Sequence, residues 1–188
     1  KPPEAPVATG SRATTFGENV KFDFTFLQAE PIAHYLDEAT KLSVATLTAG
    51  REVEDCKQTQ LNWSSFYGSP MKKVTCDGES SMASDEMRIW LQRRGTTRKI
   101  RSREVHVAEV ESHNRLIKRG ARILMTEAAA EGIHISLREA VAEATAAKNS
   151  LTEYAGFSPL QAVFGRNPDW SNAEADECKS GDVFWDSY

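Results

Sequence analysis

The sequence contains few cysteines and no long apolar segment. Its three cysteines, Cys56, Cys76 and Cys178, are odd in number and share no metal-like spacing, which argues against a disulfide framework and a zinc cluster. No apolar run approaches the roughly 18 residues that a membrane-spanning helix needs. No charged-then-apolar signal segment is present at the start. We therefore predict an intracellular protein that does not enter a membrane.

The sequence also lacks an excess of positive charge. Its 23 Lys and Arg residues and 27 Asp and Glu residues give a formal net charge of −4 at pH 7. This balance excludes binding of nucleic acid by a generally basic surface, so such a partner would need a local basic stripe. With 40% hydrophobic and 27% charged residues among 188, the composition is typical of one globular domain.

Strict alternation predicts a first strand at residues 20–27. In KFDFTFL the three phenylalanines fall on one face, while Asp23 and Thr25 fall on the other. An antiparallel hairpin is predicted next, from an extended piece at 34–36, a polar turn at 37–41 and an extended piece at 43–47.

The remaining sequence is mainly helical in pattern. It predicts a helix over about 51–66, a strand over 71–76, a helix from Ser84 to Gly95, a basic loop over 93–103, a long helix over about 105–130 and a capped helix from Ser136 to about Leu151. The long helix carries a core stripe of Val110, Ile117, Ala121 and Leu124. Strands followed mostly by helices predict an α/β fold, a mixed sheet with helices packed on it.

Three carboxylates stand where a metal-dependent reaction could use them. Asp23 lies in the first predicted strand, Asp77 ends the fourth, and Glu111 lies on the long helix. Singly, each is more often a solvated surface group. Together they could hold two Mg²⁺ or Mn²⁺ ions, because these ions prefer oxygen ligands and can clamp the attacking and leaving oxygens of a phosphodiester.

Four segments, in the same order, resemble the catalytic core of retroviral and retrotransposon integrases. They are KFDFTFL with HYLDEATKLSVATL, then VTCDGES, then EVHVAEVESHNRLIK, and finally KNSLTEYAGFSPLQAVFGRNP. The resemblance covers residues 16–168 and implies a ribonuclease H-like fold with a mixed five-stranded sheet flanked by helices. It also implies that Asp23, Asp77 and Glu111 are the catalytic metal ligands.

The resemblance implies a function in DNA integration. Metal-dependent DNA end processing and strand transfer are expected, with DNA as partner, a homo-oligomer as the active form and the nucleus as the place of action. Glu111 shares its helix face with Arg115, Lys118 and Arg122, and with Asn114 of the Glu-x-x-Asn motif these are the expected DNA contacts. Residues 1–15 are expected to be a linker from an upstream zinc-binding module, and 169–188 a tail that could begin a C-terminal domain.

Two departures from the family pattern flank the catalytic positions. Gly78 follows Asp77 directly where the family usually has Asn, and glycine is missing before Glu111. One alternative is therefore a degenerate or repurposed domain that binds nucleic acid without catalysis. Another is a ribonuclease H-type nuclease, against which GFSPLQAVFGRNP argues. The histidines form no ligand pattern, and His106 and His113 are predicted at the surface or at a helix cap.

Overall fold

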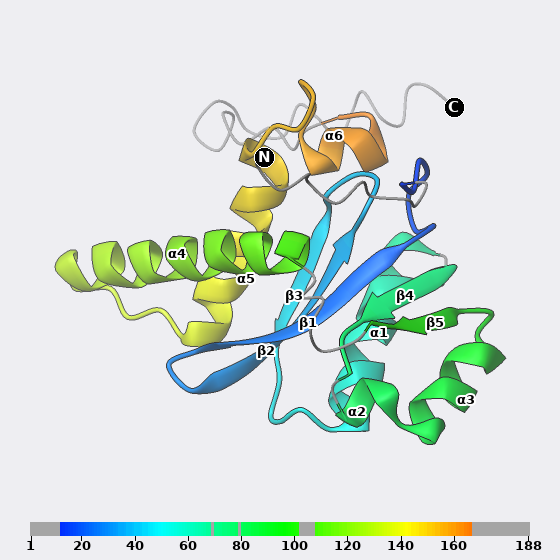
Figure 1. Cartoon of the computed structure of the whole chain (residues 1–188). Helices are drawn as coiled ribbons and strands as arrows, with labels where there is room; N and C mark the ends of the chain where they lie inside the picture. The colour runs from blue at the N-terminus through cyan, green and yellow to red at the C-terminus, as the bar shows by residue number, and fades with distance from the viewer. Residues whose placement is uncertain (1–11, 69, 79, 102–107, 167–188) are drawn as a thin grey trace, which may run out of the picture.

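The computed structural model describes residues 12–68, 70–78, 80–101 and 108–166, and its elements are shown in Figure 1. They are β1 (Val20–Leu27), β2 (Glu30–Asp37), β3 (Ser43–Leu47), α1 (Val53–Tyr67), β4 (Lys73–Cys76), α2 (Ser80–Ala83), α3 (Asp85–Arg93), β5 (Thr97–Ile100), α4 (Ala108–Ala130), α5 (Leu137–Leu151) and α6 (Pro159–Phe164). The predicted tail 169–188, most of the predicted linker 1–15, His106 and Cys178 lie outside the described residues.

One mixed sheet of five strands organises the molecule, as predicted. The strand order is β3-β2-β1-β4-β5. β1, β2 and β3 pair antiparallel as a meander, whereas β4 pairs parallel to β1 and β5 parallel to β4. No helix among the described residues is long and apolar enough to cross a membrane. The α/β fold predicted from the sequence is confirmed.

A two-residue turn joins β1 to β2. Leu27 pairs with Glu30, which leaves Gln28 and Ala29 as the loop. Both have positive φ, 52° and 67°, as a type I′ hairpin turn requires. This tight connection fixes the register that sets His34 beside Asp23 on the adjacent strand.

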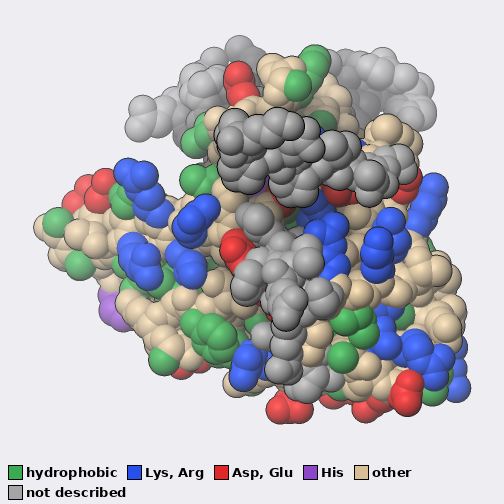
Figure 2. Space-filling model, viewed as in Figure 1, with side chains coloured by type: hydrophobic (Ala, Val, Ile, Leu, Met, Phe, Trp, Pro, Cys, Tyr) green, Lys and Arg blue, Asp and Glu red, His purple; other side chains and the backbone are tan. Residues whose placement is uncertain are grey.

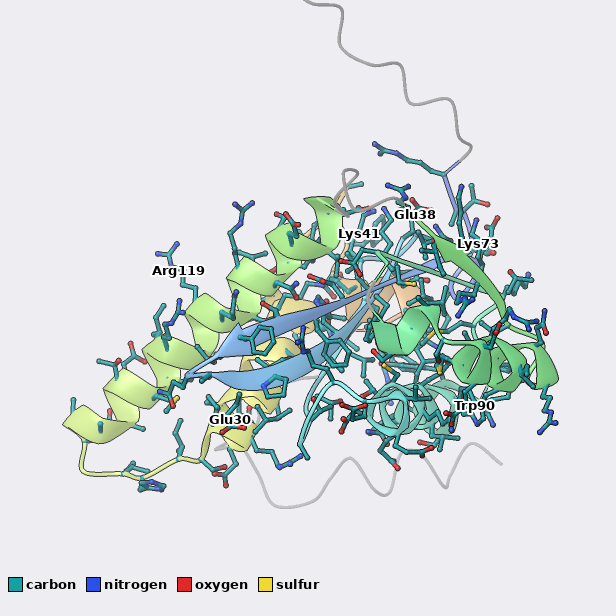
Figure 3. All side chains as sticks on the ribbon, turned by 60° about the horizontal axis from the view of Figure 1, so that its bottom comes forward. Glu30, Glu38, Lys41, Lys73, Trp90 and Arg119 are labelled. Carbon is teal, nitrogen blue, oxygen red and sulfur yellow. The ribbon has the colours of Figure 1, made fainter. Side chains whose placement is uncertain are left out.

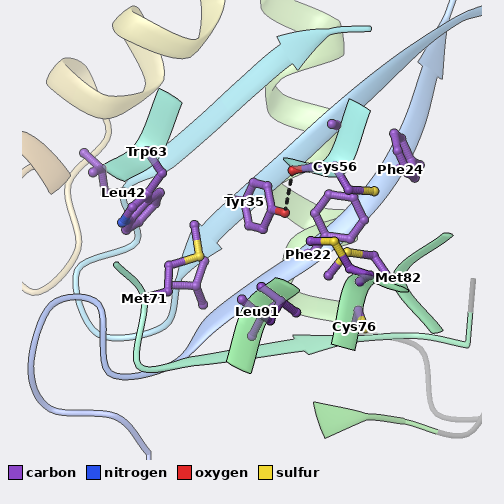
Figure 4. Packing of buried hydrophobic residues seen from close by; sticks show 14 residues of the cluster. Phe22, Phe24, Tyr35, Leu42, Cys56, Trp63, Met71, Cys76, Met82 and Leu91 are labelled. Carbon is purple, nitrogen blue, oxygen red and sulfur yellow. Dashed lines mark hydrogen bonds between the residues drawn. The ribbon is translucent and has the colours of Figure 1, made fainter. Parts of the chain in front are cut away.

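An aromatic core fills the face of the sheet that α1, α2 and α3 cover (Figures 1 and 4). Phe22 and Phe24 of β1 are buried there, and Tyr35 of β2 donates its hydroxyl hydrogen to the Cys56 carbonyl of α1. The third phenylalanine of the alternating run, Phe26, is 45% exposed because it lies near the end of the strand. The predicted division of β1 into two faces is therefore confirmed.

The opposite face is covered by α4 and α5. Leu27 and Ile32 of the sheet form a second core there with apolar residues of both helices. Of the stripe predicted for the long helix, Val110, Ile117 and Ala121 are buried and Leu124 is partly buried. Because α4 packs over β1, the face of β1 that carries Asp23 and Thr25 lies between the sheet and α4.

The prediction of a basic loop over 93–103 is partly wrong. Thr97–Ile100 forms β5, an edge strand paired with β4. Alternation did not reveal it, because three of its four residues are exposed and its place in the sheet comes from backbone pairing. Arg98 from this strand donates hydrogen bonds to the carbonyls of Met82 and Ser84, so its charge caps α2. The short α2 was also not predicted.

Helix starts were easier to predict than strand ends. Ser84 caps α3 by accepting from the Met87 amide, and Ser136 and Glu139 form a reciprocal capping box at α5. Residues 105–107 of the predicted long helix lie outside the described residues, and α4 is described from Ala108.

Candidate active site

Two of the three predicted carboxylates lie on or directly after neighbouring parallel strands, Asp23 within β1 and Asp77 just past the end of β4. β1 and β4 pair with Val20 beside Val74 and Lys21 beside Thr75. The pairing ends there, and the same register continued by two residues would bring Asp77, at the carboxyl end of β4, level with Asp23. Both side chains are half-buried. In open α/β sheets this end of parallel strands is where ligands commonly bind.

Helix α4 lies along β1 and contacts it at three levels. The Lys21 ammonium donates to Glu109, the Asn114 amide to Asp23 Oδ2 at 2.7 Å, and the Lys118 ammonium to Thr25 Oγ1 at 2.8 Å. From Glu109 to Lys118 the helix rises about 14 Å, and from Lys21 to Thr25 the strand advances about 13 Å. Helix α4 and strand β1 therefore run in the same direction and advance by nearly the same distance between these contacts.

Glu111 lies on the first turn of α4, with an exposed side chain. At about 100° per residue it is some 60° around the helix from Asn114 and about 20° from Lys118, both of which contact β1. Glu109, which faces about 200° away from Glu111, binds Lys21 and Lys41 instead.

A complete three-ligand cluster is absent from the part of the chain that the structure describes. No group of three or more His, Cys, Asp or Glu side chains there is arranged to hold a metal ion. Asp23, Asp77 and Glu111 therefore do not form such a group there, although the register of β1 and β4 points Asp77 toward the level of Asp23. The oxygen donors nevertheless have the chemistry that Mg²⁺ prefers.

Four charged side chains fasten the start of α4 to the sheet. Lys21 pairs with Glu38 and Glu109, and Lys41 pairs with Glu109. Figure 3 shows Glu38 and Lys41 near the N-terminal end of α4. Burial raises the pKa of Glu109, but the hydrogen bonds from Lys21 and Lys41 outweigh it and leave this pKa below its usual value. The network holds the turn that carries Glu111 against β1.

A buried polar row continues from Asp23 away from the solvent. Asn114 contacts His34 Nδ1 through its Oδ1 at 2.6 Å, and His34 Nε2 contacts Ser43 Oγ at 2.9 Å. Lys148 donates to the same Ser43 oxygen at 2.8 Å. Burial is the main cause that lowers the pKa of His34 to about 3, so its ring is neutral. Sequence reasoning missed His34, Ser43 and Lys148, because no spacing relates them.

His113 contradicts the prediction that it lies at the surface or at a cap. It is 5% exposed, and its ring stacks on Tyr154 with 5.6 Å between the centroids. Burial, followed by the charge of Lys148, lowers its pKa to about 4. The turn between α5 and α6 covers this side of α4, which the sequence alone did not indicate.

The basic residues predicted to bind DNA line the outer side of α4. Arg115 and Arg122 are exposed, and Lys118 is half-buried. Lys and Arg side chains gather along this helix in Figure 2, and Figure 3 shows the neighbouring Arg119 pointing away from the protein. Asn114 differs from the others, since it is 3% exposed and both ends of its amide have protein partners.

Solved structures of integrases have a similar fold. The catalytic core domain of HTLV-2 integrase in complex with magnesium, in its dimeric form, superposes with a TM-score of 0.67 at 13% identity, covering 80% of this chain and 97% of that one. Its trimeric form gives 0.66 at 14%, covering 78% and 96%. A chain of the simian T-cell lymphotropic virus intasome in complex with PP2A regulatory subunit B56 gamma gives 0.74 at 14%, covering 85% and 58%.

The sequence itself matches neither a protein-family model nor a curated protein. The likeness therefore lies in the three-dimensional arrangement of the chain. The chain has the fold of a retroviral integrase catalytic core.

Proposed function

We propose that the protein is a polynucleotidyl transferase of the integrase type, which cuts and joins DNA with divalent metal ions held by Asp23, Asp77 and Glu111. The observation that carries the proposal is the register of β1 and β4, which if continued would bring Asp77 level with Asp23, the residue whose carboxylate accepts from Asn114 of α4. The similarity of the fold to integrase cores bound to magnesium supports it.

The residues present fit a hard divalent cation in their chemistry. Aspartate and glutamate oxygens are the preferred ligands of Mg²⁺ and Mn²⁺. Glu111 would have to turn its exposed side chain toward β4, which an exposed side chain does on a picosecond to nanosecond scale. When bound, two such ions would activate the attacking oxygen and neutralise charge on the leaving oxygen.

The protein's own part in the reaction is to position groups and to supply charge. Asp23 on β1 and Asp77 just after β4 act as ligands, and Asn114 holds one oxygen of Asp23 in place. No covalent intermediate with the protein is needed, because phosphoryl transfer is catalysed mainly by positioning and charge stabilisation.

A DNA strand at the metals would run past α4. Arg115, Lys118 and Arg122 follow Glu111 at intervals of four, seven and eleven residues, so they share its side of the helix. We assign them to phosphate contacts on element ends and target DNA. Assembly as a homo-oligomer on DNA belongs to the same proposal and is supported by the dimeric and trimeric forms and the intasome of the similar structures. Action in the nucleus is part of the proposal as well and stands on the resemblance alone.

Metal-dependent stabilisation tests the site directly. Mn²⁺ at about a hundred times its Kd should add about 2.7 kcal/mol to the free energy of unfolding, because it binds only the folded state. Asp77→Asn and Glu111→Gln should lose most of that gain. Glu127→Gln on the far end of α4 is the matched control and should keep it. The same series, measured for nicking of a recessed DNA duplex, should lose activity in the same order.

A second candidate is a nucleic-acid-binding domain without catalysis. It is favoured by the absence of a converged three-ligand group among the described residues and by the substitutions beside Asp77 and Glu111. This candidate predicts that DNA binding survives EDTA and that the wild type and Asp77→Asn respond equally to Mn²⁺. Such a result would remove the enzyme proposal and leave the binding function.

A further inference from the structure

A row of buried hydrogen bonds connects Lys148 on α5 to Asp23 on β1. It passes through Ser43 on β3, His34 on β2 and Asn114 on α4. The five residues therefore come from five different elements. His34 is fully buried, and Ser43, Asn114 and Lys148 are each at most 5% exposed. A buried polar row of this extent costs free energy unless every donor meets an acceptor, so its hydrogens can be assigned.

The residues at the two ends of the row determine which atom of each hydrogen bond is the donor. Asp23 at one end is a carboxylate and only accepts, so the Asn114 group that faces it must be the NH₂. The Asn114 carbonyl oxygen then faces His34 Nδ1, which must donate. The carboxylate alone requires this orientation of the amide, because the amide oxygen has no hydrogen to donate to it.

The other end gives the same direction. In its ammonium form Lys148 has only donors, so Ser43 Oγ accepts from it, and burial lowers the pKa of this ammonium to about 7. The Ser43 hydroxyl hydrogen is then available for His34 Nε2, which accepts. A neutral histidine has one donor and one acceptor nitrogen, and the two ends demand the same tautomer. Every hydrogen bond in the row therefore points from Lys148 toward Asp23.

We propose that His34 is a positioning residue, held as the Nδ1–H tautomer, which turns the Asn114 amide so that its NH₂ group faces Asp23 and fixes that carboxylate for metal binding. The proposal rests on the proposed role of Asp23 as a metal ligand. His34 does not touch Asp23, and it acts only through Asn114. Groups that orient a metal ligand commonly change metal affinity 10- to 100-fold when they are replaced.

Alignment of all the donors strengthens the last bond in the row. Hydrogen bonds in a chain polarise one another when each donor is also an acceptor, so Lys148 increases the donor strength of Asn114 when it is protonated, below its lowered pKa of about 7. Side chains of β2, β3 and α5 thus help to fix the Asp23 carboxylate on β1. Within this row, none of these side chains contacts Asp23 directly. Without His34, the Asn114 amide would keep only the Asp23 carboxylate as its partner in this row and would be held from one side alone.

The tautomer can be read directly from the whole protein in solution. A long-range ¹H–¹⁵N correlation spectrum of the wild type, without metal, should show His34 with a protonated Nδ1 and an unprotonated Nε2 across neutral pH. A protonated Nε2 would overturn the proposal, because Asn114 would then have to turn its carbonyl toward Asp23. This readout requires neither activity nor metal binding, so it remains decisive if the proposed function fails.

Two substitutions separate positioning from packing. In His34→Asn the side-chain amide lies where Nδ1 was and can still donate to Asn114. In His34→Gln the amide lies where Nε2 was and retains only the Ser43 side. Both variants shorten or reshape the same buried side chain, so both should lose thermal stability.

The variants should nevertheless differ in metal affinity. We expect the Mn²⁺ dissociation constant, measured by titration calorimetry, to stay within about threefold of wild type in His34→Asn and to rise about tenfold or more in His34→Gln. Equal affinities in the two variants would show that His34 only fills space. If either variant does not fold, the wild-type spectrum decides. A wild type that binds no Mn²⁺ would instead refute the proposed function.

Discussion

Burial of two histidines determines how this protein responds to acid. The pKa of His34 is lowered to about 3 and that of His113 to about 4, with burial as the first cause in both. An unfolded histidine titrates near pH 6.5. Between about pH 6.5 and 4 the unfolded chain therefore binds more protons than the folded one, so stability is fully present above this window and is lost as the pH falls through it.

The free energy of unfolding should fall with decreasing pH by up to about 2.7 kcal/mol per pH unit between pH 6.5 and 4.5, one proton for each histidine. His113→Phe keeps the stacking on Tyr154 and should reduce this slope by about half. Urea unfolding at a series of pH values measures it. His134→Phe, at an exposed position, is the control, and an equal slope in His113→Phe and wild type would contradict the account.

The sequence could predict which residues share a face, but not which faces are covered. Asp23 and Thr25 were assigned correctly to the polar side of β1, since side chains alternate along a strand. That this side is buried depends on α4, which contacts it from far along the chain. His34, Asn114 and His113 are buried for the same reason, so their roles could not be predicted from local patterns.

Helices α4 and α5 approach closely at a glycine. A Cβ atom added at Gly120 would lie 3.1 Å from the Cβ atom of Ala144 on α5. In the sequence this glycine weakens a long helix, at a cost of roughly 1 kcal/mol relative to alanine. The contact explains its presence, because a larger residue would push apart the two helices that carry the proposed DNA path and the buried row.

Gly120→Ala should lower the free energy of unfolding by about 1 kcal/mol, since overpacking of 1 to 3 kcal/mol exceeds the gain in helix propensity. Chemical denaturation measures the loss. The double variant Gly120→Ala with Ala144→Gly should recover part of it, because the new methyl group then has room. If Gly120→Ala alone stabilises the protein, the helices can separate without cost and the contact does not set their distance.

At the level of elements, sequence reasoning succeeded where one residue determines the outcome. Ser84 and Ser136 marked helix starts correctly, because a side chain that accepts from the first free amides is a local requirement. β5 was missed, because an exposed edge strand is defined by the neighbour whose backbone it pairs with. The five-stranded sheet itself was expected only from the resemblance to integrases.

Charge is distributed unevenly over the whole molecule. The net charge is −4, yet basic side chains follow the outer side of α4 (Figure 2). Acidic residues such as Glu109 and Glu38 are paired with lysines near the start of this helix. DNA affinity should therefore depend on one stripe of cations and should be strongly sensitive to salt.

Arg115→Gln with Lys118→Gln should flatten the slope of log affinity against log salt by roughly 1.4 to 1.8, because two phosphate contacts are lost. Glutamine keeps a donor for Thr25, so the fold should persist. Fluorescence anisotropy on a recessed duplex provides the slope. Arg93→Gln with Arg138→Gln removes the same charge from α3 and α5 and should leave the slope unchanged. Equal slopes in the two double variants would refute the α4 path.

The parallel pairing of β1 with β4 also has a kinetic consequence. The meander of β1, β2 and β3 joins consecutive segments, whereas β4 pairs with β1 although β2, β3 and α1 separate the two strands in the sequence. Contacts between distant segments close late, because loop entropy opposes them. Mn²⁺ at the proposed site should then slow unfolding while leaving the refolding rate nearly unchanged, as stopped-flow measurements with and without the ion would reveal.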